Sequence, residues 1–412
     1  MMNYSACVIG LGYVGLPLLH ELGKADLNVI GFDVDRLHVE NLKQGLVRIE
    51  DLDVKEFNKL VQNGRIQITS ELESELTSDS YIICVPTPLD EKKIPDLTYV
   101  ISAANYISKF LKNRCLVVLE STTYPGTTEI LLKNIFDNHN KILGKDYLLA
   151  YSPERIDPGQ KEFSFKDIPK VIAGYDGDSL AAVKELYSKI CSQVVIAKSL
   201  KVAEMSKLLE NTFRHINIAL VNELKQVCDL LEINVWEVIK CAETKPYGFM
   251  SFKPGIGVGG HCIPIDPNYL AFEIKNKFGK SFRFIDLANK INEEMPRYTV
   301  DLIKNKLKSL EISLNQARIL LLGMSYKKNI SDTRESPSLK VAEILKSLGC
   351  EINYVDPFVP SVEIFGETIQ SLHIDEINRN WDLVVQLQAH DNFIENITSR
   401  KTNFLDMTGS YE

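Results

Sequence analysis

Cys262 follows a glycine-rich segment, residues 255–260, in which four of six residues are glycine. Backbone of this composition adopts dihedral angles that other residues avoid, or lies where a ligand approaches the main chain closely. A thiol at the end of such a loop is presented rather than packed. His261 beside it and Asp266 four residues later can tune its ionisation. The pattern predicts that Cys262 is a nucleophile.

The other seven cysteines lie singly in apolar strand or helix patterns, where a thiol is usually inert. The chain has no CxxC pair and no basic start to its apolar N-terminus. Isolated cysteines without a secretory signal predict reduced thiols in a cytoplasmic protein.

A second motif, GLGYVG at residues 10–15, follows a short apolar run and opens a helical pattern. Its first glycine permits a tight turn, the second lets a pyrophosphate approach the backbone, and the third lets helix and strand pack closely. Asp33 ends the next apolar run, where an acid binds adenosine ribose hydroxyls and favours NAD over NADP, although Arg36 is near. The predicted cofactor-binding residues here are Gly10, Gly12, Tyr13, Val14, Gly15 and Asp33.

Two later apolar runs end in segments rich in hydroxyls and proline, residues 85–88 and 120–123. In a doubly wound sheet the carboxyl ends of the strands face the ligand crevice. Pro86, Thr87 and Thr122 are therefore predicted to contact the cofactor, with plain turn formation as the alternative.

An NAD site together with a nucleophilic cysteine restricts the reaction. Oxidation of an alcohol gives an aldehyde, a thiolate captures it as a thiohemiacetal, and a second oxidation gives a thioester that water cleaves. This predicts a four-electron dehydrogenase. Lys207 and Asn211, four residues apart on one helix face, can stabilise the oxyanions. Alternatively, Glu204 and Lys207 form a surface ion pair.

The framework that must position these groups is α/β. Alternating apolar runs and helical patterns over about the first 195 residues predict a parallel, doubly wound sheet. The strands are expected at residues 5–10, 28–32, 81–85, 116–120, 147–151 and 170–173, with a helix at 14–22.

Residues 200–232 contain no Gly or Pro and predict a long helix whose apolar surface suggests a homodimer or a higher oligomer. After this helix, strand and helix patterns alternate again, with strands expected at 317–323, 350–354 and 381–386 and a helix at 338–348. The predicted fold class is α/β, with two Rossmann-like doubly wound domains joined by a long central helix. The expected domains are 1–198 (NAD binding), 199–312 (helical, dimerisation and catalytic loop) and 313–412 (nucleotide-sugar binding).

Composition narrows the class further. The 412 residues are 45 % apolar and carry a net charge of −8, which argues against a general nucleic-acid binder. The sequence contains no run of about 18 apolar residues, so no membrane span is predicted. A chain of this length needs no disulfide or metal to hold its core, and no metal site is predicted.

Seven motifs in order carry a resemblance over essentially the whole chain: GLGYVG, VPTPL, ESTTYPGTT, YSPERIDPG, AEMSKLLENTFR, GVGGHCIPIDP and MSYKKNISDTRESPS. With them the chain resembles the nucleotide-sugar 6-dehydrogenases, which include UDP-glucose, UDP-N-acetylhexosamine and GDP-mannose dehydrogenases. The resemblance implies NAD-dependent, two-step oxidation of a sugar 6-hydroxyl to a uronic acid. It also implies an N-terminal NAD domain, a dimer-forming helix and a C-terminal domain that holds the nucleotide.

The resemblance also implies roles for individual residues. Cys262 matches the nucleophile, Lys207 and Asn211 match the residues that stabilise the oxyanions, and Asp266 matches the acid after the cysteine. Further matches are Thr122 and Glu154, which order the hydrolytic water, Gly259 and Lys327, which bind substrate, and Arg334, which reaches the cofactor or active site. One departure is Arg155-Ile156-Asp157-Pro158, where some UDP-glucose enzymes carry a second acid after the Pro-Glu motif.

Arg155 and Arg214 resemble the UDP-N-acetylhexosamine branch, since the UDP-glucose enzymes carry apolar residues there. An arginine fork can donate to an N-acetyl carbonyl or a phosphate, although both arginines could equally pair with nearby acids. The expected substrate is UDP-N-acetylglucosamine or its galacto epimer, for a surface polysaccharide, with UDP-N-acetylmannosamine, UDP-glucose and GDP-mannose as alternatives. Other classes left open are a two-electron dehydrogenase, which Cys262 argues against, and a non-catalytic NAD-binding oligomer.

Overall fold

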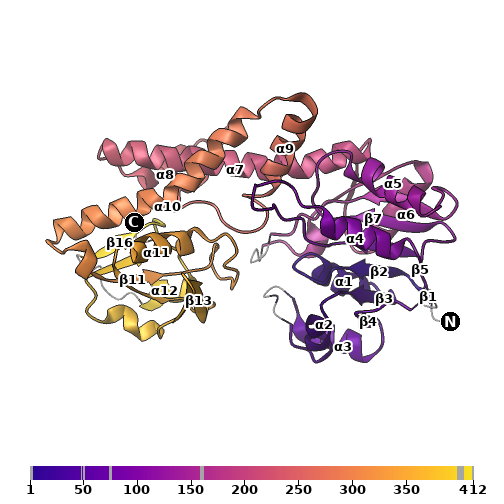
Figure 1. The fold of residues 1–412 in the computed structure, drawn as a ribbon, viewed down its shortest axis with the longest axis horizontal. Helices are drawn as coiled ribbons and strands as arrows, with labels where there is room; N and C mark the ends of the chain where they lie inside the picture. The colour runs from indigo at the N-terminus through magenta and orange to yellow at the C-terminus, as the bar shows by residue number, and fades with distance from the viewer. Residues whose placement is uncertain are drawn as a thin grey trace. The chain divides into compact units, whose positions relative to one another are not determined.

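The computed structural model describes residues 3–47, 49, 52–73, 77–157, 162–396 and 403–410. Figure 1 follows the chain from its N-terminus in indigo to its C-terminus in yellow. Unit 1 consists of Met1–Glu210 and Asn268–Glu273, and unit 2 of Asn211–Pro267 and Ile274–Glu412. The division into three domains expected from the sequence stays a prediction.

Unit 1 is built on an eight-stranded sheet in the order β10-β9-β8-β7-β6-β2-β3-β4. Short apolar runs form its middle strands, which are buried on both faces as parallel strands require. Its strands are β2 (Ala6–Ile9), β3 (Val29–Phe32), β4 (Ile66–Thr69), β6 (Ser80–Ile83), β7 (Cys115–Leu119), β8 (Tyr147–Tyr151), β9 (Lys170–Gly174) and β10 (Val194–Ile196). A separate pair, β1 (Asn3–Tyr4) and β5 (Thr77–Ser78), lies outside this sheet.

The expectation of an all-parallel sheet is wrong at one place. β9 runs antiparallel to β8, whereas the other neighbours in the sheet are parallel. A parallel connection needs a long crossover, usually a helix. Between β8 and β9 the described residues form only a 3-10 turn, η2 (Phe165–Asp167), so the chain returns antiparallel.

Helices cover both faces of the unit 1 sheet, which confirms the doubly wound expectation. On one face α1 (Gly15–Lys24), α3 (Val54–Gln62) and α6 (Gly177–Tyr187) share a core with alternate residues of the strands. On the other face α4 (Thr98–Ile107) packs on β6, and the π-helical turn η1 (Thr127–Leu132) packs on β8. The remaining helices of this unit are α2 (Arg36–Lys43) and α5 (Lys133–Asn138).

The long helix α7 spans Leu200–Leu230, close to the predicted 200–232. Its 31 residues correspond to about 46 Å at 1.5 Å per residue. It begins in unit 1 and continues in unit 2. Among the described helices none is long and apolar enough to cross a membrane.

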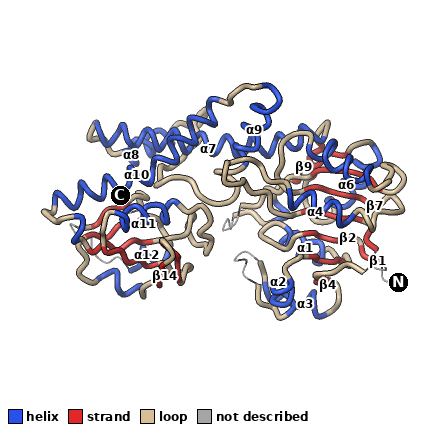
Figure 2. The backbone as a smooth tube through the Cα atoms, viewed as in Figure 1, coloured by secondary structure: helices blue, strands red, loops and turns tan. Residues whose placement is uncertain are grey.

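Unit 2 contains the second sheet, four parallel strands in the order β12-β11-β15-β16, as expected for a smaller Rossmann-like lobe. Figure 2 shows these strands in red with helices in blue. An antiparallel hairpin, β13 with β14, was not predicted. The strands are β11 (Arg318–Leu322), β12 (Glu351–Val355), β13 (Ser361–Ile364), β14 (Glu367–Gln370), β15 (Leu383–Gln386) and β16 (Phe404–Asp406). The helices are α8 (Val235–Glu243), α9 (Asp266–Phe278, which passes through both units), α10 (Arg283–Ser309), α11 (Pro337–Ser347) and α12 (Asp391–Asn396), with 3-10 turns η3 (Leu314–Gln316) and η4 (Ile374–Asn378).

Candidate active site

The turn between β2 and α1 needs glycine at two positions for reasons internal to the fold. Gly10 has φ +93°, and a Cβ there would lie 2.9 Å from the Cys84 carbonyl oxygen. A Cβ on Gly15 would lie 1.8 Å from the Gly10 carbonyl oxygen. A Cβ on Gly12, in contrast, would have no described atom within 4 Å. Gly12 is therefore the position that is open to an approaching ligand.

The N-terminus of α1 is prepared for an anion. Its N-cap residue, Val14, has no polar side chain, so no side chain caps the first turn of the helix, where the Leu16 N–H donates to the Gly12 carbonyl at 3.1 Å. Asp33, half-buried at the end of β3, accepts the Leu11 N–H at 2.8 Å through Oδ2 and the Asp35 N–H at 3.0 Å through Oδ1. This open cradle with a fixed acid fits the pyrophosphate and adenosine ribose of NAD.

The other predicted residues of unit 1 follow β6, β7 and β8, which are adjacent strands. Pro86 and Thr87 follow β6, Thr122 follows β7, and Glu154 and Arg155 follow β8. Because these strands are parallel, their carboxyl ends meet at one edge of the sheet. The structure thus brings these residues to the same sheet edge as the glycine turn.

Thr123 is a candidate that the sequence interpretation missed. It is fully buried, and its hydroxyl has no hydrogen-bond partner among the described residues, whereas Thr122 is half-buried. Buried hydroxyls normally have partners, so this one, at the sheet edge of the predicted site, makes Thr123 a candidate to bind a polar ligand. The burial of Thr123 depends on neighbouring strands, and the motif ESTTYPGTT gave no signal that separates the two threonines.

Glu154 is buried and held from three sides. Its Oε1 accepts the N–H groups of Arg155 and Ile156 at 2.6 Å each, and its Oε2 lies 2.9 Å from the Lys170 ammonium. Burial alone would raise the pKa of Glu154, but Lys170 and the two N–H groups outweigh it and the pKa is lowered. Glu154 is therefore a carboxylate. Lys170 had no role in the sequence interpretation.

Arg155 pairs with a nearby acid, which is the alternative to substrate binding that the sequence left open. Its Nη2 lies 2.8 Å from Oε1 of Glu210, and its Nη1 donates to the Pro169 carbonyl at 2.7 Å. The guanidinium is thus bound by protein groups within unit 1. Arg214 is exposed on α7.

The alternative that Glu204 and Lys207 form a surface ion pair is wrong, because Glu204 is not at the surface. This carboxylate is fully buried and accepts the Thr128 N–H at 2.9 Å, the Thr128 hydroxyl at 2.7 Å and the Gly126 N–H at 2.5 Å. Burial raises its pKa to about 7. Glu204 therefore fixes the start of the π-helical turn that follows the predicted Thr122 segment, and Lys207 lies one turn further along α7.

In unit 2 the structure brings three predicted residues together. The main chain turns sharply after Cys262, whose carbonyl accepts the N–H groups of Ile265 at 3.1 Å and Asp266 at 2.8 Å. The Asp266 carboxylate accepts the Asn211 amide at 2.5 Å. Cys262 is partly buried, while Cys241 in α8 is exposed and the other cysteines are buried. The nucleophile candidate, the acid and the amide thus form one cluster.

The DTRES segment, residues 332–336, supports the glycine loop. The Gly260 N–H donates to the Arg334 carbonyl at 3.0 Å, and the Arg334 guanidinium contacts both Asp332, at 2.6 Å, and His261, at 3.0 Å. A Cβ on Gly259 would lie 2.6 Å from Cβ of Tyr326, so close packing accounts for this glycine. Lys327 lies beside Tyr326 in the loop after β11.

The predicted residues divide between the units. Unit 1 contains Glu154, Arg155 and Lys207 and all predicted cofactor-binding residues except Arg334, namely Gly10, Gly12, Tyr13, Val14, Gly15, Asp33, Pro86, Thr87 and Thr122. Asn211, Arg214, Gly259, Cys262, Asp266, Lys327 and Arg334 belong to unit 2.

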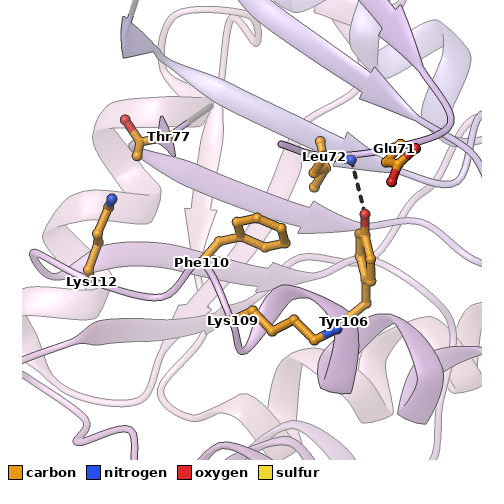
Figure 3. Close-up of a pocket in the computed structure, with 7 residues that line it drawn as sticks. All are labelled: Glu71, Leu72, Thr77, Tyr106, Lys109, Phe110 and Lys112. Carbon is orange, nitrogen blue, oxygen red and sulfur yellow. Dashed lines mark hydrogen bonds between the residues drawn. The ribbon is translucent and has the colours of Figure 1, made fainter. Parts of the chain in front are cut away.

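Pockets open on the described part of unit 1. Figure 3 shows a pocket of about 320 Å³ beside α4, in which the Leu72 N–H donates to the Tyr106 hydroxyl. None of its lining residues was predicted as a site residue; they are Glu71, Leu72, Thr77, Tyr106, Lys109, Phe110 and Lys112. A larger cleft, of about 630 Å³, is lined by Tyr13 and Arg155. The larger cleft is therefore the one that adjoins the predicted site.

Comparison with known proteins agrees with this geometry. The NAD-binding, central and UDP-binding domains of the UDP-glucose/GDP-mannose dehydrogenase family match residues 4–191, 201–294 and 320–409. The chain is 36 % identical to a UDP-N-acetyl-D-glucosamine 6-dehydrogenase of Pseudomonas aeruginosa, over 89 % of this chain and 86 % of that protein. It is 37 % identical to a UDP-N-acetyl-D-mannosamine dehydrogenase of Methanococcus maripaludis, over 94 % and 86 %.

A solved structure, described as a UDP-D-ManNAc dehydrogenase from Pyrococcus horikoshii, superposes with a TM-score of 0.87 at 30 % identity. The match covers 100 % of this chain and 96 % of that one. The two Rossmann-like lobes and the long helix are therefore shared with a known enzyme.

Proposed function

The chain belongs to the UDP-glucose/GDP-mannose dehydrogenase family and is an NAD-dependent nucleotide-sugar dehydrogenase, and from this premise we propose that it oxidises the 6-hydroxyl of a UDP-N-acetylhexosamine to the uronic acid. The preferred donors are UDP-N-acetylglucosamine and UDP-N-acetylgalactosamine, for a surface polysaccharide precursor. Support comes from Arg155 and Arg214, which resemble this branch, and from relatives named for N-acetylhexosamine substrates.

The observation that carries the proposal is the Cys262 cluster. In the sharp turn after Cys262 the main-chain N–H of Asp266 donates to the Cys262 carbonyl, and the Asp266 carboxylate in turn accepts the Asn211 amide. A structural cysteine needs no such arrangement, whereas a nucleophile beside a carboxylate and an amide donor has the parts for acyl chemistry. Gly12 and Asp33 would hold NAD, which would supply the hydride acceptor for each oxidation, one NAD molecule per oxidation.

The residues of the chain perform the remaining steps. The Cys262 thiolate bonds to the aldehyde carbon, and Lys207 and Asn211 stabilise the resulting oxyanion. After the second oxidation a thioester links the sugar carbon to Cys262. Water ordered by Glu154 and Thr122 then attacks the thioester carbon, the carbon–sulfur bond breaks, and the thiolate leaves as the uronate forms. Lys327, Gly259 and Arg214 bind the substrate, and Arg334 serves the cofactor or the active site.

The same proposal includes a cytoplasmic homodimer. Apolar side chains of α7 are exposed at helical spacing, with Val202 at 53 %, Leu209 at 61 % and Leu220 at 60 %. A stripe of this kind on a long helix is typical of a surface that pairs with another copy.

Replacing Cys262 tests the mechanism. Cys262→Ser is expected to abolish steady-state uronate formation from UDP-N-acetylglucosamine while NAD binding, followed by fluorescence titration, stays within twofold. Cys241→Ser, in the exposed helix α8, is the matched control and keeps full turnover. Unchanged turnover in Cys262→Ser removes the covalent route. Turnover only with UDP-glucose or UDP-N-acetylmannosamine changes the substrate, and NAD binding with no turnover on any donor supports the non-catalytic oligomer.

A further inference from the structure

A buried charge cluster lies directly behind Glu154 in unit 1. Lys170 on β9 is 4 % exposed, and its ammonium lies 2.9 Å from Oε2 of Glu154 and 3.2 Å from Oε1 of Glu120. Glu120, at the end of β7, is 1 % exposed and bonds the Tyr187 hydroxyl of α6. One ammonium thus contacts two buried carboxyl groups, Glu120 at 1 % exposure and Glu154 at 8 %.

The two carboxyl groups are not equivalent. Glu154 has the shorter contact to Lys170 and two main-chain N–H donors. Glu120 has the longer contact, and its Oε2 has no hydrogen-bond partner among the described residues. Burial raises the pKa of Glu120 to about 7, despite Lys170, whereas Lys170 and the N–H groups lower the pKa of Glu154. A neutral cluster therefore consists of ionised Lys170 and Glu154 with protonated Glu120.

The surroundings hold Lys170 in place. Its ammonium lies 5.8 Å from the ring centroid of Phe165 and 5.2 Å from that of Tyr187. The titratable groups that face the cluster are the thiols of Cys84 and Cys191 and the Tyr187 hydroxyl; burial raises the pKa of each of these three, which keeps them neutral. Beside Glu154, the Arg155 guanidinium is paired with Glu210. Lys170 is therefore the cation that contacts Glu154.

We propose that Lys170 is a positioning residue for thioester hydrolysis: it fixes the Glu154 side chain and keeps it ionised so that it can accept a proton from the attacking water. This rests on the proposed function. In the step, the water oxygen bonds to the thioester carbon, one water proton passes to Glu154, the carbon–sulfur bond breaks, and the Cys262 thiolate leaves. Without the ammonium, burial is opposed only by the two N–H donors, which favours the protonated form of Glu154 that cannot take that proton.

Rapid-quench kinetics with intact-protein mass spectrometry tests the proposal. In Lys170→Met, steady-state turnover of the preferred UDP-N-acetylhexosamine is expected to fall on the order of 100-fold while the KM values for sugar and NAD change less than about threefold. A burst of two NADH per site precedes the slow phase, and an acyl adduct accumulates on Cys262. The acid limb of the kcat–pH profile moves up by about one unit or more.

Companion variants separate this role from a structural one. Lys170→Arg keeps the charge and is expected to restore turnover to within about tenfold and to remove the adduct. Lys170→Gln replaces Lys170→Met if the latter does not fold. Glu120→Gln leaves Lys170 to Glu154 alone, so turnover is retained without an adduct. Lys225→Met removes another buried lysine, one paired with Asp229 on α7, and leaves the acid limb unmoved.

The outcomes distinguish two failures. One NADH per sugar in the wild-type enzyme overturns the proposed function whatever the variants show. Two NADH per sugar in the wild type, with no adduct and an unmoved acid limb in the neutral Lys170 variants, overturns only the role of Lys170. An adduct in Glu120→Gln also overturns it, since Glu120 would then be the acid that acts on water.

Discussion

The two Rossmann-like lobes begin with the same turn, but they differ in whether the helix that follows is capped and in how exposed the acid beside the turn is. In each lobe a glycine in the left-handed region follows the first strand, Gly10 with φ +93° and Gly323 with φ +89°. The next N–H donates to an acid at the end of the neighbouring strand: Leu11 to Asp33 at 2.8 Å, and Met324 to Asp356 at 2.7 Å. Up to this point the lobes are structurally alike.

They differ in what remains free. In unit 1, α1 follows within a few residues, its N-terminus has no side-chain cap, and Asp33 is half-buried. In unit 2, residues 323–336 separate β11 from α11, and Ser336 caps that helix by accepting the Ser338 N–H at 3.2 Å. Asp356 is 3 % exposed and is bonded by His390.

The comparison shows that the acid after the second strand does not by itself make a dinucleotide site. The site also requires an uncapped helix and an acid with lone pairs that a ribose can reach. Among the described residues unit 1 meets both conditions and unit 2 does not, which agrees with the family's NAD-binding domain in the first lobe and its UDP-binding domain in the other.

The largest expected effect comes from replacing Asp356, the buried acid beside the turn after β11 in unit 2. Asp356 accepts N–H groups from Met324, Phe358 and Val359 besides the His390 contact, so Asp356→Asn leaves buried donors facing an amide. The expected loss is about 3–5 kcal/mol of unfolding free energy in urea titration. Asp382→Asn, a more exposed acid of the same lobe, is the control, with an expected loss of about 1 kcal/mol or less.

The pH dependence of this loss has a definite sign. Burial alone would raise the pKa of Asp356, but the bonds from His390 and the main chain outweigh it and the pKa is lowered. The stabilisation is therefore present above the unfolded pKa and lost as pH falls through the folded one. A deficit in Asp356→Asn that does not shrink toward acid pH contradicts the ionised, structural acid.

Asp33→Ala is expected to disrupt the corresponding turn of unit 1, between β2 and α1. It removes the acceptor for Leu11 and the predicted ribose ligand, so the apparent NAD constant is expected to rise about 30-fold or more, which corresponds to about 2 kcal/mol. Affinity for UDP, measured by calorimetry, stays within twofold. Equal losses for both ligands would place Asp33 outside the cofactor site.

Glu204 in unit 1 and Asp356 in unit 2 are both buried, but their pKa values are shifted in opposite directions. Glu204 in unit 1 has its pKa raised by burial to about 7, so stability falls as pH rises from the unfolded value of 4.5 toward 7. Glu204→Gln loses a hydrogen bond but escapes this penalty. Relative to wild type, its unfolding free energy is expected to improve on the order of 2 kcal/mol between pH 5 and pH 8. A parallel pH dependence in the two proteins rejects the buried proton.

The smallest effect is also the most selective. A Cβ on Gly12 meets no described atom within 4 Å, so Gly12→Ala should fold normally and yet weaken NAD binding about tenfold, or about 1.4 kcal/mol, by crowding the pyrophosphate. Gly177→Ala, an equally open glycine at the start of α6, is the matched control. Unaltered NAD binding in Gly12→Ala means that the cofactor does not lie on this turn.

Local patterns in the sequence were sufficient for most strands and the long helix. β8 lies at Tyr147–Tyr151 as predicted, because a short buried run bounded by polar residues has one stable solution in a parallel sheet. The β13–β14 hairpin was missed, since its strands are short and largely exposed. The antiparallel β9 was missed because orientation depends on the connection rather than on the strand itself.

The site was predictable where chemistry and local backbone coincide, as in the glycine turn and the Cys262 loop. It was not predictable where a role depends on partners distant in sequence. Lys170 looks like an ordinary strand residue, and its significance comes from Glu120 and Glu154 on neighbouring strands. Helix spacing predicts an ion pair between Glu204 and Lys207, but in the folded chain the Glu204 carboxylate accepts hydrogen bonds from Thr128.

The most direct test of the account is the number of NADH molecules formed per sugar consumed by the wild-type enzyme. UDP-N-acetylglucosamine, UDP-N-acetylgalactosamine, UDP-N-acetylmannosamine and UDP-glucose are run in parallel, with uronate measured by mass spectrometry. The account predicts two NADH and one uronate per sugar with an N-acetylated glucosamine or galactosamine donor. One NADH per sugar, with aldehyde or ketone as product, would contradict the covalent route through Cys262.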